Sequence, residues 1–155
     1  TWGDPGDLSD ADTDFYLHET YARLGITESL DYVLAHSFQT RTRPFGTTPV
    51  NAFKMYGLAN YLIWTVNEHV GLGARYEWLY AGEGVGTALS PNVITPGTHF
   101  HAFTLGANVG VRGCFTFRPE IRYDWADFDG PAPGPFDNGT EDSQFTYGIQ
   151  TIFTW

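Results

Sequence analysis

The stretch that decides the fold is FTFRPEIRYDW, residues 115–125, in which apolar and polar side chains alternate without a break. Successive side chains of a β-strand point to opposite faces, so the segment predicts a strand with one apolar and one charged face. The segment QFTYGIQTIFTW, residues 144–155, repeats this scheme with aromatic residues on one parity. A membrane-spanning β-barrel turns such an apolar face toward lipid, whereas a soluble sandwich buries it in a core. Alternation alone does not distinguish these two folds.

The whole chain divides into strand-like segments separated by connections of alternating length. Short turns at residues 27–29, 65–68 and 112–114 alternate with long polar loops at 42–49, 81–97 and 127–142. Outer-membrane barrels combine short periplasmic turns with long extracellular loops. We therefore predict an all-β fold, an antiparallel up-and-down transmembrane β-barrel with about seven strands visible. The expected strands are residues 14–26, 30–41, 50–64, 69–80, 98–111, 115–126 and 144–155.

Composition excludes several functional classes. The 155 residues carry a formal net charge of −10, which argues against nucleic acid as a partner. One cysteine leaves no disulfide framework and no thiolate zinc cluster. The sequence contains no Gly-x-Ser-x-Gly elbow, phosphate loop or dinucleotide fingerprint. We expect no enzymatic activity and no cofactor.

The rhythm of the connections also predicts an orientation. With the short turns in the periplasm, residues 1–13 form an extracellular acidic loop and residues 14–155 form the barrel strands. Bacterial barrels have an even number of strands and both ends of the barrel in the periplasm. Seven strands with an outward first end are therefore expected to be part of a larger barrel. An upstream barrel segment or other copies in a homo-oligomer would complete it.

Four blocks of sequence carry a resemblance to a known family: residues 55–64 (MYGLANYLIW), 73–78 (GARYEW), 104–108 (TLGAN) and 118–125 (RPEIRYDW). They resemble the outer-membrane beta-barrel porin family of type 2, and the last block is the most specific. That block sits near the C-terminus of family members, which are generally longer, so the resemblance implies a C-terminal portion of the barrel. It also implies a pore in the outer membrane. The sequence departs from the family pattern after Trp78.

The charged side chains of two strands are the main candidates for a site in the lumen. The intervening strand presents small residues to the same face, which leaves room for long side chains to meet. One interpretation is an internal salt-bridge ladder that holds the wall, and another is an ion-selective constriction. A catalytic acid–base pair is a third. The residues concerned are Arg75, Glu77, Arg118, Glu120, Arg122 and Asp124.

Aromatic residues at the strand ends predict the two girdles that membrane interfaces favour. Histidines 99 and 101 share a face and would chelate a metal if a third ligand converged, but a polar position at a strand end is the simpler interpretation. The predicted girdle residues are Trp64, Trp78, Tyr80, Tyr123, Trp125, Phe153 and Trp155.

Acidic residues near the start of the chain form a weak calcium candidate. Asp10, Asp12 and Asp14 have the alternate spacing of a calcium loop, but the glycine and glutamate of an EF-hand are missing. A solvated acidic loop, which would make the outer mouth acidic, is the alternative.

These observations predict a porin-like barrel in the cell outer membrane that allows passive diffusion of small polar solutes or ions, with membrane lipid around it. One alternative is a structural or adhesive surface barrel with a blocked lumen. Another is a soluble lipocalin-like β-barrel that binds a ligand.

Overall fold

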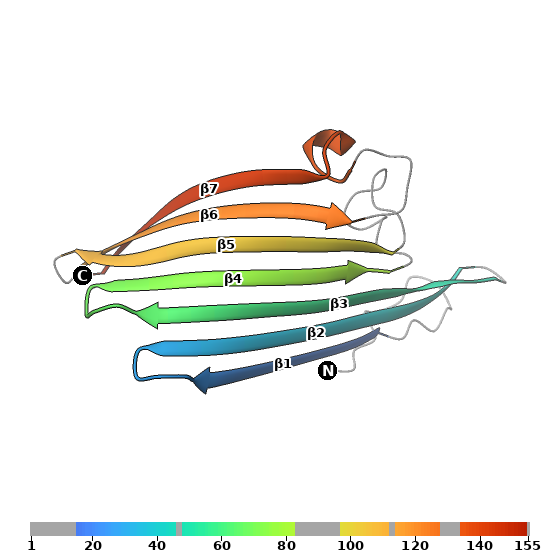
Figure 1. Ribbon diagram of the computed structural model, residues 1–155. Helices are drawn as coiled ribbons and strands as arrows, with labels where there is room; N and C mark the ends of the chain where they lie inside the picture. Colours follow the sequence, from blue (N-terminus) through green and yellow to red (C-terminus); the bar gives the residue numbers. More distant parts are fainter. Residues whose placement is uncertain (1–14, 46–47, 83–96, 112–113, 128–133, 155) are drawn as a thin grey trace.

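The computed structural model describes residues 15–45, 48–82, 97–111, 114–127 and 134–154, and these form one sheet of seven antiparallel strands (Figure 1). Strands that follow each other in sequence are neighbours in the sheet, so the topology is a simple meander. The sheet is open, with β1 and β7 as its two edges, and is not closed into a barrel. The strands are β1 (Phe15–Gly25), β2 (Leu30–Phe45), β3 (Thr48–Thr65), β4 (Val70–Ala81), β5 (Thr98–Val111), β6 (Phe115–Asp127) and β7 (Ser143–Phe153).

A 3-10 turn, η1 (Asp137–Gly139), lies between β6 and β7. Among the described residues, no helix is long and apolar enough to cross a membrane.

The predicted strands are all present, but one predicted loop is wrong. Residues 42–49 were expected as a long loop, whereas β2 continues to Phe45 and β3 begins at Thr48, with Phe45 opposite Thr48. The register shifts between Arg41 and Arg43. A bulge of this kind shifts the parity of the side chains, so the two-residue period breaks although backbone pairing continues. The sequence pattern therefore ends before the strands do.

Two of the short turns are stabilised by the same kind of hydrogen bond, from a backbone N–H to a side-chain oxygen three residues earlier. The backbone N–H of Leu30 donates to Thr27 Oγ1 at 3.0 Å in one turn, and that of Val70 donates to Asn67 Oδ1 at 2.9 Å in the other. A short polar side chain thus satisfies a backbone donor where the strand restarts. These turns lie at one end of the sheet, which we call the turn end; the opposite end, where β1 and β7 begin, we call the loop end (Figure 1).

Continuous register gives the sheet two faces of opposite chemistry. The register aligns apolar side chains of neighbouring strands in rows on one side of the sheet, as in the row Leu62, Ala74, Leu105, Ile121 and Tyr147. We call this side the apolar face and the other the polar face. In the strand residues whose side chains the structure describes, every Asp, Glu, Lys and Arg lies on the polar face except Lys54 and Asp127, both at the loop end.

The polar face is the more enclosed side of the sheet. All the buried strand residues belong to it, and most are small: Val33, Ala81, Thr98, Ala102, Thr104, Asp124 and Ala126. By contrast, the large side chains of the apolar face are widely exposed, with Phe145 at 63% and Tyr147 at 83%. An apolar surface of this extent marks contact with a partner or a membrane.

Close packing between β2 and β3 leaves little room for a side chain at position 57. Gly57 lies opposite Ser37, and a Cβ added to it would stand 2.6 Å from Ser37 Oγ. We expect Gly57→Ala to lower the free energy of unfolding by about 1–2 kcal/mol through overpacking, and Ser37→Ala in the same chain to recover most of this loss. Thermal unfolding followed by circular dichroism measures both. Gly148→Ala, where no atom lies within 4 Å of the added Cβ, is the matched control; a similar loss there would contradict the steric explanation.

Candidate functional site

The charged side chains of the polar face lie in cross-strand rows of alternating sign. A basic row holds Arg23, Arg75 and Arg122, which are connected through the paired positions of the strands between them. The next row toward the loop end holds Glu77 and Asp124. The next row toward the turn end is again acidic, with Asp31 and Glu120 at its paired positions. Each arginine thus has carboxylates on neighbouring rows.

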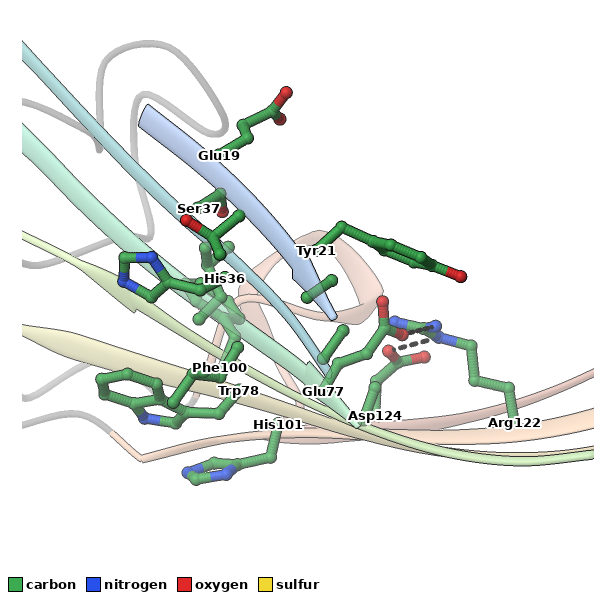
Figure 2. A pocket seen from close by; sticks show the side chains of 17 residues that line it. Glu19, Tyr21, His36, Ser37, Glu77, Trp78, Phe100, His101, Arg122 and Asp124 are labelled. Atoms are coloured by element: carbon green, nitrogen blue, oxygen red, sulfur yellow. Dashed lines mark hydrogen bonds and ion pairs between the residues drawn. The ribbon is translucent and has the colours of Figure 1, made fainter. Parts of the chain in front are cut away.

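Arg122 is the centre of an ion-pair cluster (Figure 2). Its Nε donates to Asp124 Oδ1 at 2.7 Å, and its Nη1 donates to Glu77 Oε2. Gln144 Nε2 on β7 donates to the other oxygen of Asp124 at 3.3 Å. Charge-assisted hydrogen bonds of this kind are stronger than neutral ones. Asp124 is only 8% exposed, so its carboxylate depends on these partners rather than on water.

Arg75 extends the cluster on the same face. Its Nε lies 3.1 Å from Glu77 Oε2 as an ion pair, and its Nη2 donates to Thr104 Oγ1 at 3.4 Å. The guanidinium carbon lies 5.9 Å from the centre of the Tyr61 ring, within cation–π range. Glu77 therefore joins two arginines from different strands.

Small residues on β5 allow β4 and β6 to meet. Ala102 stands between Glu77 and Asp124 in one row, and Thr104 stands between Arg75 and Arg122 in the next. Both are nearly buried, at 3% and 5% exposure. Since both side chains are short, the longer charged side chains of β4 and β6 make contact over them.

The remaining predicted lumen residues stand apart from the cluster. Arg118 is exposed and donates from Nη1 to Gln150 Oε1 on β7 at 3.2 Å. Glu120 is exposed, and the structure places no ion pair or hydrogen bond on its side chain among the described residues. The structure thus brings together Arg75, Glu77, Arg122 and Asp124 and leaves the other two nearer the turn end.

One ion pair of the polar face was not predicted from the sequence. Arg23 Nη2 donates to Asp31 Oδ2 at 2.6 Å across the β1–β2 hairpin. The signal was available: the two residues flank a short turn at matching parity, which places them on one face of a hairpin.

The predicted girdle residues lie on the apolar face at both ends of the sheet. Trp78, Tyr80, Tyr123 and Trp125 lie toward the loop end, whereas Trp64 and Phe153 lie toward the turn end. Trp155 lies outside the described residues.

Histidines are built into the loop-end belt of aromatic rings. Trp78 Nε1 donates to His99 Nδ1 at 3.0 Å, and the two rings stack at 24°. His101 stacks on Trp125 with ring centres 5.0 Å apart and meets the Tyr76 hydroxyl at 2.9 Å. These contacts make the two histidines members of the belt rather than an isolated chelating pair.

No metal centre is evident in the part of the chain that the structure describes, since no three His, Cys, Asp or Glu side chains there converge. The calcium candidates Asp10, Asp12 and Asp14 lie outside that part, as does the predicted acidic loop at residues 1–13.

Two hollows flank the ion-pair cluster on the polar face. The one nearer the loop end has a volume of about 550 Å³ and is lined by Glu19, Tyr21, Ser37 and the Glu77–Arg122–Asp124 group (Figure 2). The labelled side chains of His36, Trp78 and His101 point to the other side of the sheet in this view. The second hollow, nearer the turn end, measures about 600 Å³ and is lined by Arg75 and Arg118 among others.

A meander sheet with one apolar face and one ion-paired face is the kind of sheet that forms the wall of a β-barrel. The family model described as "Putative beta-barrel porin-2, OmpL-like" matches residues 3–155. The chain therefore belongs to this family, and the match includes the four resembling blocks as well as the strands before them. No curated protein and no solved structure gave a match.

Glu77 is the carboxylate on which the cluster depends. Replacing it with Gln keeps the volume but leaves Arg75 and Arg122 without their shared anion, so we expect Glu77→Gln to lower the free energy of unfolding by about 1–2 kcal/mol. Denaturant unfolding of the purified protein measures the change. Glu120→Gln, which breaks no contact, should stay within about 0.5 kcal/mol of the parent. Equal effects of the two variants would show that charge alone, rather than the contacts of Glu77, is responsible.

Proposed function

We propose that the chain forms part of the wall of an outer-membrane β-barrel through which small polar solutes or ions diffuse passively. The observation that carries the proposal is the segregation of charge between the two faces of the sheet. The apolar face holds no Asp, Glu, Lys or Arg between its loop-end residues Lys54 and Asp127 and the turn end, among the strand side chains described. A surface in lipid must exclude such charges, whereas a surface in a water-filled lumen accepts them. Family membership supports the same conclusion and argues against an enzyme.

Barrel closure is the second part of the proposal. Among the described residues, the edge strands β1 and β7 each have a neighbouring strand on one side only, and backbone groups without partners are costly inside a membrane. Both strands run from the loop end to the turn end. Direct pairing of β1 with β7 would thus be parallel, and an antiparallel wall needs further strands between them. We propose that those strands complete the barrel, whichever chain supplies them.

Within this barrel, the cluster of Arg75, Glu77, Arg122 and Asp124 would project into the lumen. Its four side chains are about balanced in charge and are bonded to one another, which suits a rigid charged wall. Together with Arg118, they would set which solutes pass. The same cluster would also serve a barrel with a blocked lumen, so pore activity decides between the two functions.

Conductance in a planar lipid bilayer tests the pore directly. We expect stepwise, ohmic currents after addition of the purified protein. The double change Arg118→Ala with Arg122→Ala should shift the reversal potential in a salt gradient toward cation selectivity, because two positive charges leave the lumen. Inserted but silent protein would contradict the pore and favour the structural barrel. Unchanged selectivity in a conducting variant would remove these arginines from the constriction.

Contact of the apolar face with lipid has its own test. Ile149 lies on the apolar face and Ile152 on the polar face of β7. We expect Ile149→Lys to destabilise the inserted protein by about 2–4 kcal/mol if the residue lies near the bilayer midplane. Ile152→Lys, the same change toward the lumen, should cost much less. Folding into lipid vesicles at increasing urea concentration measures both, and equal losses would argue against a lipid-facing apolar side.

A further inference from the structure

The hollow near the turn end has a floor of glycines that the fold does not need. Gly71 and Gly73 of β4, Gly106 of β5 and Gly148 of β7 all line it. Among the described residues, positive φ occurs at other glycines, so backbone conformation does not require these four. A Cβ at Gly73 or Gly106 would meet its nearest atom at 4.0 or 3.5 Å, and one at Gly148 would meet nothing within 4 Å. Packing does not require these three either.

Glycine inside a strand weakens it and often marks a place where another group approaches the backbone closely. A side chain at these positions would extend into the hollow. The glycines therefore keep about 600 Å³ open beside the sheet.

Two arginines line this hollow, and one of them has hydrogen-bond donors to spare. Arg118 is exposed and uses one of its N–H groups on Gln150, although a guanidinium carries five. Arg75 is held by Thr104 and by the Glu77 carboxylate, which lies 3.1 Å from its buried Nε. Arg118 is therefore the guanidinium that a solute can reach.

The other polar groups of the hollow indicate which kind of solute would bind there. Asn108, Thr104 and the amide of Gln150 can donate or accept, and Glu120 is the one carboxylate among the lining residues. Arg75 and Arg118 outnumber this carboxylate in the lining, in contrast to the loop-end hollow, where Glu19, Glu77 and Asp124 outnumber Arg122. A planar anion with two acceptor oxygens matches a guanidinium best.

We propose that the turn-end hollow is a binding site for the carboxylate group of a small organic solute. The guanidinium of Arg118 holds the carboxylate, the Gln150 amide orients that guanidinium, and the glycine floor receives the body of the solute. This site rests on the proposed pore function, because the solute would reach it through the lumen. Binding itself does not depend on transport.

Equilibrium binding of 4-fluorobenzoate to the full chain in detergent micelles tests the site, with the ¹⁹F chemical shift and line width as the readout. We expect saturable binding that Arg118→Gln weakens at least tenfold. Gly148→Val, which fills the hollow at a position with free space, should weaken it by a similar factor. Arg23→Gln removes the same charge from the same face outside the lining and should change the dissociation constant less than twofold.

The probe 4-fluorobenzyl alcohol, which lacks the carboxylate, should bind at least tenfold more weakly. The site is wrong if the alcohol binds as well as the acid, if Arg23→Gln and Arg118→Gln lose affinity equally, or if no saturable binding occurs. Bilayer currents without benzoate binding would overturn the site and leave the pore intact. Benzoate binding to protein that gives no current would overturn the pore and leave the site.

Discussion

An antiparallel register that continues from β1 to β7, with a shift only at the β2–β3 bulge between Arg41 and Arg43 among the described residues, is the constraint on which the rest of this structure depends. From the β1–β2 hairpin to β7, each strand continues the parity of its neighbour, so side chains of one kind stay on one face across the sheet. A slip of a single residue between two strands would turn the whole face of one of them over. If β6 slipped against β5, Arg122 would lie on the face of Phe103 and Leu105 and would be separated from Glu77. Segregation of charge, the ion-pair cluster and the two hollows therefore all follow from register.

Register also explains why the charges form rows rather than scattered pairs. Side chains at paired positions of neighbouring strands stand side by side, and those two residues apart along a strand stand in adjacent rows. Arg75 and Arg122 occupy one row, and Glu77 and Asp124 occupy the next. Arg122 thus touches one anion along its own strand, Asp124, and one across β5, Glu77, whereas Arg75 touches Glu77 along its own strand. The cluster crosslinks strands that share no backbone hydrogen bonds.

Sequence alone predicted much of this fold because the strands have clean alternation. Residues 98–111 were predicted with both ends as observed in β5, and residues 115–126 ended one residue short of β6. The prediction failed at residues 42–49, where the bulge after Arg41 ended the period but not the pairing. For the site, parity gave the face of all six charged candidates. It did not say that Arg118 and Glu120 stay apart from the other four, because that depends on which residues stand opposite each other.

The hydrogen bond between Trp78 and His99 has a consequence for the way β4 and β5 are joined at the edge of the apolar face. An indole nitrogen only donates, so the Nδ1 atom of His99 is the acceptor of this contact. The two rings also stack at 24°. The residue directly opposite Trp78 is His101, and the residue directly opposite His99 is Tyr80, so the bond runs diagonally between the strands. It therefore links two side chains that the backbone register does not place opposite each other.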